Sequence, residues 1–148
     1  MEPSPPVRSR SRVDVFIHFV WATKRRQQWL SPELEGPIYR CLAQEAQRFD
    51  CRVLAIGGTS DHLHVLVGLN AKTTIGQLCK AMKGVSSAMA RDLTDGDADG
   101  WQDNYAAFSV SRQHLKRVTA YIQNQKTHHA MGDLWASVEN LDFEQSNQ

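Results

Sequence analysis

Strand-length and helix-length segments alternate along this chain in an order that few folds accommodate. Residues 13–21 (VDVFIHFVW) alternate apolar side chains on one face, which predicts a half-buried strand. Two more strand-length apolar runs lie within residues 51–69, where the turn-forming stretch GGTSD predicts a hairpin. Residues 104–111 (NYAAFSVS) are the last segment with a strand pattern.

Helical patterns separate these strands and follow the last one. Residues 31–50 place Pro32 at the first helical position after the N-cap candidate Ser31, and residues 73–93 repeat apolar side chains at helical spacing. A third helix is predicted over residues 111–131. The order β-α-β-β-α-β-α predicts an α+β fold of the ferredoxin-like (RRM-like) type, with an antiparallel sheet, two crossover helices and an extra C-terminal helix.

Length and composition suit one domain with its own core, since 41% of the 148 residues are hydrophobic. We place this domain at residues 13–130, between a disordered basic arm at 1–12 and a C-terminal tail at 131–148. No stretch approaches the roughly 18 apolar residues of a membrane span, and no apolar segment follows the basic N-terminus as in a signal peptide. We therefore expect a cytoplasmic protein with no membrane partner. Its odd number of cysteines and the lack of a CxxC pair predict reduced thiols at Cys41, Cys51 and Cys79.

A formal net charge of +1 argues against a protein that coats nucleic acid through bulk charge. The charges are nevertheless segregated, with acids concentrated in residues 92–103 and near the C-terminus. The bases gather early, at Arg8, Arg10, Arg12, Lys24, Arg25 and Arg26. Either this end of the molecule faces a polyanion, or solvated faces of opposite sign happen to separate.

Two histidines, His62 and His64, interrupt the apolar run SDHLHVLVGL. Because successive side chains of a strand point to opposite faces, both imidazoles share one face, and Leu63, Val65 and Val67 take the other. Two imidazoles about 7 Å apart along a strand can converge on one cation. A histidine at a strand edge is also common as a satisfied polar group, so the motif alone leaves both interpretations open.

A tyrosine and an amide lie in register on the last predicted helix. Tyr121 and Gln125 are four residues apart and therefore lie one above the other, beside an apolar stripe of Leu115, Val118 and Ile122. A helix that follows the last strand can cross the sheet and bring this side against the histidines. Taken alone, Tyr121 is more typical of a core aromatic residue, and Gln125 of a surface position.

Three motifs together resemble the single-tyrosine HUH transposase family, which includes the insertion-sequence and REP-associated tyrosine transposases. They are HFVWATKRR (18–26), DHLHVLV (61–67) and FSVSRQHLKRVTAYIQNQKTHH (108–129). The resemblance covers nearly the whole domain. It implies that Tyr121 is the nucleophile, carried by the extra C-terminal helix, and that His62, His64 and Gln125 bind a divalent cation. The basic arm and the aspartate-rich loop lie outside these motifs, and we assign them no role.

The implied activity is that of a single-strand DNA transposase and endonuclease. It would cleave and rejoin hairpin-bearing DNA through a 5′-phosphotyrosine intermediate, without ATP. A phenol, with a pKa of about 10, is a weak nucleophile at neutral pH, and a cation that polarises the scissile phosphate would assist it. Because the implied ligands are all neutral, we expect weak binding of Mg²⁺ or Mn²⁺ until the DNA phosphate joins them, with Mn²⁺ better matched to imidazole.

The partners that we expect are single-stranded DNA with hairpins and a second copy of the chain. Trp21 and Trp29 are candidates either to stack on bases or to join the core. The family implies a homodimer whose sheet continues across a two-fold axis, with the tyrosine helix docked on its own subunit or on the other. Candidate contacts to DNA phosphates are Lys24, Arg25, Arg26, Lys80 and Lys83.

Two other functions compete with this interpretation. A domesticated relative would bind DNA hairpins without cutting them, although the presence of all four site residues disfavours it. A metal-dependent hydrolase would use the histidines and a water molecule, and Asp61 is its candidate general base. Incubation with a labelled hairpin oligonucleotide separates the three, because the transposase alone forms a covalent adduct.

Overall fold

A computed structural model describes residues 11–126 of the chain. Within this range the elements follow the predicted order. They are β1 (Val15–Ala22), η1 (Lys24–Arg26), α1 (Pro32–Arg48), β2 (Arg52–Thr59), β3 (His62–Leu69), α2 (Ile75–Leu93), β4 (Ala106–Val110), η2 (Arg112–His114) and α3 (Leu115–Gln123). The predicted tail at 131–148, and all but two residues of the predicted arm at 1–12, lie outside the described residues.

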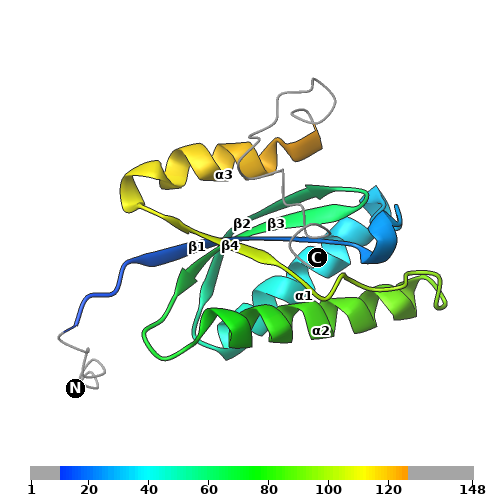
Figure 1. Ribbon diagram of the computed structural model, residues 1–148, viewed down its shortest axis with the longest axis horizontal. Helices are drawn as coiled ribbons and strands as arrows, with labels where there is room; N and C mark the ends of the chain where they lie inside the picture. Colours follow the sequence, from blue (N-terminus) through cyan, green and yellow to red (C-terminus); the bar gives the residue numbers. More distant parts are fainter. Residues whose placement is uncertain (1–10, 127–148) are drawn as a thin grey trace, which may run out of the picture.

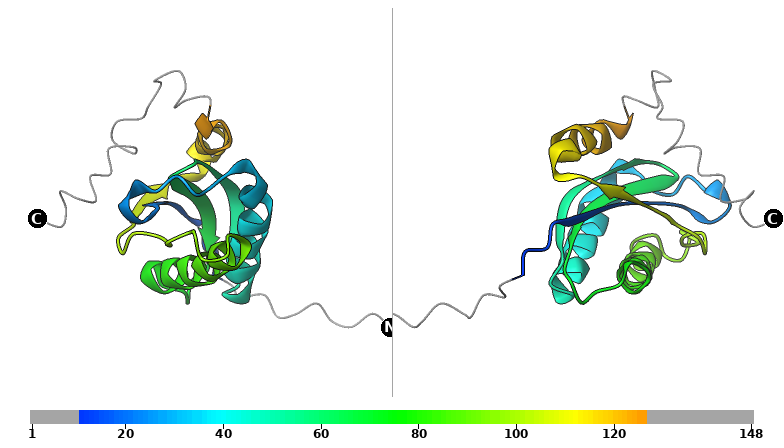
Figure 2. Two further views of the ribbon diagram at one scale, coloured as in Figure 1. Left: turned by 90° about the vertical axis from the view of Figure 1, so that its right-hand side faces the viewer. Right: turned by 60° about the vertical axis from the view of Figure 1, so that its left-hand side comes forward.

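The strands form one antiparallel sheet in the order β2-β3-β1-β4. Helices α1 and α2 cover one face of this sheet, and α3 crosses the other (Figures 1 and 2). This is the ferredoxin-like arrangement followed by one further helix, as the alternation of strand and helix patterns predicted.

Each face of the sheet has its own apolar cluster. Leu63, Val65 and Val67 of β3 pack with α1 and α2 in the larger cluster. The predicted division of β3 is therefore confirmed, because its histidines point to the opposite face, under α3. The smaller cluster on that face consists of Phe16, Ala55, Leu66, Val118, Tyr121 and Ile122.

Two strand boundaries differ from the prediction. β1 begins at Val15, and Val13, which we expected on its buried face, is 41% exposed. β2 continues through residues 57–59, so the hairpin turn consists of Ser60 and Asp61 rather than of the whole GGTSD stretch. Backbone pairing with β3 holds the two glycines in the strand, although their sequence is typical of a loop.

The helices differ from the prediction in smaller ways. The buried side of α2 is rotated toward its small residues, so that Ser86 and Ala90 are buried while Leu93 is 47% exposed. The predicted last helix begins as the 3-10 turn η2 before α3 starts at Leu115, and its predicted extension beyond residue 126 lies outside the described residues. No helix among residues 11–126 is long and apolar enough to cross a bilayer. The three cysteines are free thiols, as expected, and all are buried.

The contact between α3 and β2 depends on Gly57. A Cβ atom at this position would lie 1.9 Å from the backbone carbonyl oxygen of Ile122, far inside van der Waals contact. A backbone oxygen cannot swing away as the end of a side chain can, so a larger residue would push α3 off the sheet. Gly57 is paired with His64 in the ladder between β2 and β3, which places this contact beside the histidines.

Replacing Gly57 with alanine should therefore displace α3. We expect Gly57→Ala to lower the free energy of unfolding by about 1–3 kcal/mol, the usual cost of overpacking. The matched control is Gly84→Ala in α2, where a Cβ meets nothing within 4 Å. Because alanine has a higher helix propensity than glycine, Gly84→Ala should be as stable as the wild type or more stable by about 1 kcal/mol.

Urea denaturation of both variants measures these differences, and amide hydrogen exchange shows whether the loss of protection is concentrated in α3. Equal stability of the two variants, with unchanged protection of α3, would contradict the close contact at Gly57.

Candidate active site

The two histidines of β3 lie under α3 with their Nδ1 atoms already engaged. Nδ1 of His62 lies 3.0 Å from Oδ1 of Asp61 and 2.9 Å from Oγ1 of Thr59. Nδ1 of His64 lies 2.8 Å from Nε2 of His18. The centroids of the His62 and His64 rings are 5.2 Å apart, and both side chains are buried. Since both Nδ1 atoms are engaged, Nε2 is the atom of each ring that suits a cation.

Asp61 orients His62 from the turn between β2 and β3. Its other carboxylate oxygen accepts a hydrogen bond of 3.2 Å from Nε of Arg26 in η1. The hydrogen bond with His62, aided by Arg26, outweighs the effect of burial and holds the pKa of Asp61 well below its usual range. The carboxylate is therefore ionised at neutral pH. A carboxylate on the far nitrogen is the usual orienting partner of a metal-binding imidazole.

The structure adds a third histidine to the site, His18 of β1. It is 2% exposed, and its ring centroid lies 5.0 Å from that of His64. We assigned it no role from the sequence, although the alternation of β1 places it on the face opposite Ile17 and Phe19. The missing information was the register of β1 against β3, in which His18 pairs with Leu66. The register between two strands that are distant in the sequence cannot be predicted from a local sequence pattern.

Tyr121 and Gln125 approach the site from the last helical segment. The Tyr121 ring meets the His64 ring edge to face, with centroids 5.7 Å apart and an interplanar angle of 84°. Gln125 is 1% exposed, and its Nε2 atom donates to the backbone oxygen of Tyr121 at 3.2 Å. Gln125 also lines a small pocket with Gly57 and Gly58 of β2. The predicted approach of this helix to the histidines is therefore present.

The donor atoms of this site fit a divalent cation. Oε1 of Gln125 is buried and accepts no hydrogen bond from any residue in the described range 11–126. A buried polar atom of this kind raises the free energy of the fold unless a ligand satisfies it. No group of three or more His, Cys, Asp or Glu side chains in the same range is arranged to hold a metal. The candidate donor set therefore remains the two imidazoles and the amide oxygen, and their joint binding of a cation stays a prediction.

The first three predicted DNA contacts belong to the exposed turn η1. Lys24, Arg25 and Arg26 follow β1 directly, and both arginines have a left-handed backbone, with φ of 54° and 55°. Arg25 forms an ion pair with Asp99, and Arg26 forms one with Asp61. A DNA phosphate would compete with these carboxylates. Because Asp61 also contacts His62, η1 lies next to the histidines, and its contact with DNA stays a prediction.

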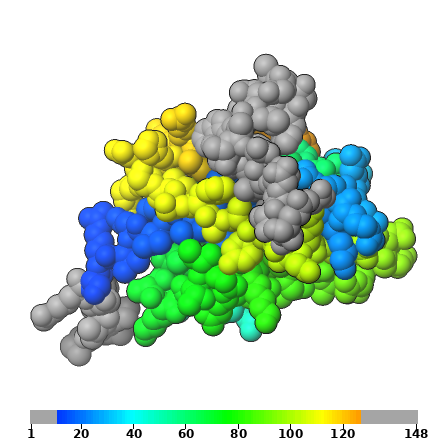
Figure 3. Space-filling model, viewed as in Figure 1, coloured from blue at the N-terminus to red at the C-terminus, as the bar shows by residue number. Residues whose placement is uncertain are grey.

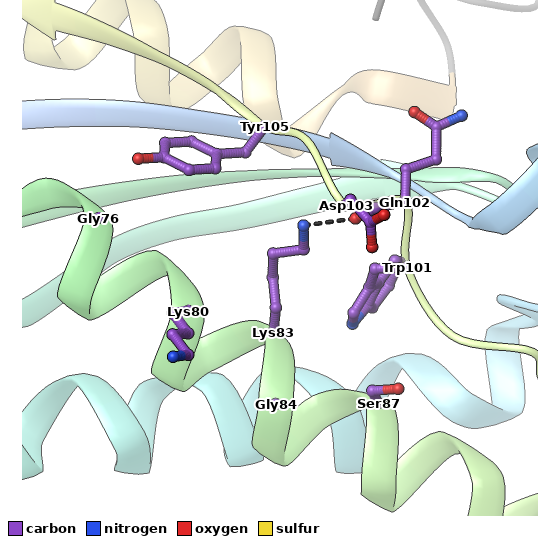
Figure 4. Close-up of a pocket in the computed structure, with 9 residues that line it drawn as sticks. All are labelled: Gly76, Lys80, Lys83, Gly84, Ser87, Trp101, Gln102, Asp103 and Tyr105. Atoms are coloured by element: carbon purple, nitrogen blue, oxygen red, sulfur yellow. Dashed lines mark hydrogen bonds between the residues drawn. The ribbon is translucent and has the colours of Figure 1, made fainter. Parts of the chain in front are cut away.

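Lys80 and Lys83, the other two predicted contacts, line a separate pocket between α2 and the segment that precedes β4 (Figure 4). Nζ of Lys83 donates to the backbone oxygens of Gln102 and Asn104 there, and burial lowers its pKa. α2 packs on the face of the sheet opposite to α3, which covers the histidines, and the space-filling view shows α2 below the residues of β4 and α3 (Figure 3). The structure therefore does not gather these lysines with the histidines, and their contact with DNA stays a prediction.

The tryptophans contribute mainly to the core. Trp21 is fully buried, so it cannot stack on bases, and that part of the prediction is wrong. Trp29 is partly buried and packs on Trp101, with ring centroids 4.8 Å apart. Nε1 of Trp101 in turn donates to Oγ of Ser86 in α2 at 2.8 Å. This cluster fixes the segment before β4 on the helical face of the sheet.

Comparisons with known proteins agree with this fold. The sequence matches the family of IS200-like transposases over residues 11–125. No curated protein matches the chain.

Two solved structures are similar to this one. A protein from Deinococcus radiodurans, assigned as a transposase, is 26% identical with a TM-score of 0.62, over 80% of this chain and 96% of that one. A REP-associated tyrosine transposase bound to a REP hairpin has the same fold at 13% identity and a TM-score of 0.55, over 81% of this chain and 70% of that one. Since the family match spans the entire sheet, both histidines of β3 and α3, the chain belongs to the IS200-like transposase family.

Proposed function

We propose that this transposase cleaves and rejoins single-stranded DNA that carries a hairpin, through a covalent bond between Tyr121 and a 5′ phosphate. The observation that carries the proposal is the buried contact between the rings of Tyr121 and His64, which come from separate elements. Family membership supports strand cleavage and transfer as the reaction class. The REP hairpin bound to the similar transposase supports a hairpin as the substrate.

In the proposed step, the phenolic oxygen of Tyr121 attacks the scissile phosphorus in line. A bond forms between the phosphorus and the phenolic oxygen, and the bond from the phosphorus to the 3′ oxygen breaks. The phenol loses its proton and the 3′ oxygen takes one up, which leaves a 5′-phosphotyrosine and a free 3′-hydroxyl. Because one phosphodiester replaces another, attack by a 3′-hydroxyl rejoins the DNA without ATP.

We infer that Nε2 of His62, Nε2 of His64 and Oε1 of Gln125 would hold a divalent cation, Mg²⁺ or Mn²⁺. Such a cation, when bound, polarises the scissile phosphate as a Lewis acid. Asp61 keeps the His62 ring in place, and the bond from Gln125 Nε2 to the helix backbone leaves Oε1 as the ligating atom. With neutral donors throughout, the site gains most of its affinity for the cation when a phosphate oxygen joins it.

Access to the proposed site requires movement. Tyr121, His62 and His64 are each 4% exposed or less. A DNA phosphate reaches the phenol only after the part of the chain that covers these side chains has opened. We therefore infer that DNA binding and opening of the site are coupled, as in enzymes whose closed sites open for substrate.

The two competing functions are less well supported. A hydrolase would need Asp61 as its general base, but this carboxylate is engaged by His62, Arg26 and Thr59, and its low pKa makes it a weak base. A hairpin-binding protein without activity would not need a buried amide oxygen beside the tyrosine. The retained Gln125 therefore favours cleavage over binding alone.

We further propose a homodimer in which edge strands pair across a two-fold axis. β2 and β4 are the edges of the described sheet, and edge strands present backbone groups to another copy. Within one chain Tyr121 already lies against His64. Exchange of the helix would need a hinge in residues 111–114 (SRQH), between β4 and α3, but Arg112 of this stretch donates a hydrogen bond of 2.8 Å to Oδ1 of Asp14. We therefore infer that each site of the dimer uses the tyrosine and histidines of one chain.

Tyr121→Phe should abolish the covalent adduct, because the ring still packs on His64 but lacks the attacking oxygen. Affinity for the hairpin should change little. Tyr105→Phe, the same chemical change at an exposed position away from the histidines, is the matched control and should form the adduct; its hairpin affinity is measured as well, because Tyr105 lines the pocket of Lys80 and Lys83. Denaturing gels of a labelled hairpin oligonucleotide with each variant give the answer. An adduct in the Tyr121→Phe reaction would show that another residue is the nucleophile.

Gln125→Leu should remove metal-dependent cleavage while the chain stays folded. The substitution loses the bond to the Tyr121 carbonyl but also removes a buried oxygen, so its stability should stay within about 1 kcal/mol of the wild type. Gln123→Leu, on an exposed position of the same helix, should change neither property. Mn²⁺-dependent adduct formation and urea denaturation measure the two effects. Cleavage at the wild-type rate by Gln125→Leu would exclude this amide as a ligand.

Mixing Tyr121→Phe chains with His64→Ala chains should not restore cleavage, because each site needs both residues from one chain. Light scattering should give twice the chain mass, with or without hairpin DNA. Recovery of activity on mixing would instead demonstrate that the tyrosine helix is exchanged between subunits. A monomer under both conditions would rule out the dimer.

A further inference from the structure

We propose that His18 is a positioning residue that holds His64 in the tautomer able to bind the cation. The inference rests on the metal site proposed above. It concerns a residue to which neither the sequence motifs nor the proposed chemistry gave a role.

The hydrogen bond between the His18 and His64 rings determines which nitrogen of His64 carries its proton. Nε2 of His18 and Nδ1 of His64 are 2.8 Å apart in a site where both side chains are buried. Two imidazole nitrogens at this distance share one proton, so one donates and the other accepts. A neutral His64 that binds a cation through Nε2 must carry its proton on Nδ1. His64 is therefore the donor, and Nε2 of His18 is the acceptor.

This arrangement overcomes a preference of the free side chain. An isolated neutral histidine favours the tautomer with the proton on Nε2, which would turn an N–H rather than a lone pair toward the cation. Metal-binding histidines usually avoid this because a carboxylate or a carbonyl accepts the proton on the other nitrogen. Asp61 accepts it from His62, and His18 takes the same part for His64.

The position of His18 in the sheet suits a fixed acceptor. β1 is a central strand, and His18 is paired with Leu66 of β3 on one side and with Phe108 of β4 on the other. Its ring also lies against the Phe108 ring, with centroids 6.1 Å apart. The acceptor thus belongs to the rigid sheet and not to α3. His64 keeps its tautomer when the site opens for DNA.

A neutral acceptor also limits the charge in the site. A carboxylate at position 18 would place a buried anion near the cation site, in addition to the half-buried Asp61, and a buried anion costs free energy unless it is fully paired. An imidazole accepts the same hydrogen bond without that cost.

Two substitutions separate hydrogen bonding from packing. His18→Gln keeps an acceptor, since Oε1 of glutamine lies as many bonds from the backbone as Nε2 of histidine. His18→Leu fills similar space without an acceptor. Phe16→Leu, on the same face of β1, is the control for altered packing in this cluster.

NMR spectra of the imidazole nitrogens show directly which nitrogen carries the proton. We would record them without metal and at a pH of about 8.5, because imidazole with its ordinary pKa of about 6.5 is neutral there. We expect the proton of His64 on Nδ1 in the wild type, His18→Gln and Phe16→Leu, and on Nε2 in His18→Leu. Titration with Mn²⁺, followed by broadening of the same signals, should show affinity about 10–100-fold weaker in His18→Leu and nearly unchanged in the other two.

The outcomes distinguish failure of this proposal from failure of the metal site. If His18→Leu keeps both the tautomer and the Mn²⁺ affinity of the wild type, His18 is a core residue and the positioning role is overturned while the metal site stands. If the wild type binds no Mn²⁺ even with hairpin DNA present, or His64→Ala binds it equally well, the metal site itself is overturned and this proposal with it.

Discussion

The contact of α3 with β2 decides where Tyr121 and Gln125 lie relative to the histidines of the sheet. At Gly57 the helix backbone comes so close that no side chain fits between the two elements. Tyr121 directly precedes Ile122, the residue whose carbonyl makes this contact, so its ring is set against the histidine that pairs with Gly57. Gln125 follows one helical turn later. Since catalytic groups lose effect when they are misplaced by about 1 Å, a larger residue at Gly57 would disturb the proposed chemistry without taking part in it.

The face under α3 carries an unusual number of polar side chains for a buried surface. Polar groups of this kind destabilise a fold unless they are hydrogen-bonded. The imidazoles of His18 and His64 bond to each other, and Asp61 bonds to His62. The other face of the sheet, packed against α1 and α2, holds the larger apolar cluster. The face with the smaller apolar cluster therefore carries the residues of the proposed site.

Much of the architecture follows from local patterns. The alternation of strand and helix periodicities predicted the order of elements, and the HLHV alternation predicted which residues of β3 face the core. Both inferences depend on side-chain direction along a single element, which is a property of the local backbone. The motif around each histidine and around Tyr121 likewise identified the family. The GGTSD loop was the main error, because glycine is typical of turns and its role in a close helix contact has no local signal.

The sequence by itself determined the types and order of the main elements, the core face of β3 and the residues that carry the family motifs, because each of these depends on neighbours a few positions apart. Tertiary structure alone decided that His18 meets His64, that the η1 arginines reach Asp61 and Asp99, and that the α2 lysines lie away from the histidines. Those contacts depend on strand register and on the face to which each helix packs. Both are set by long-range packing of the whole domain, which no short segment of the chain contains.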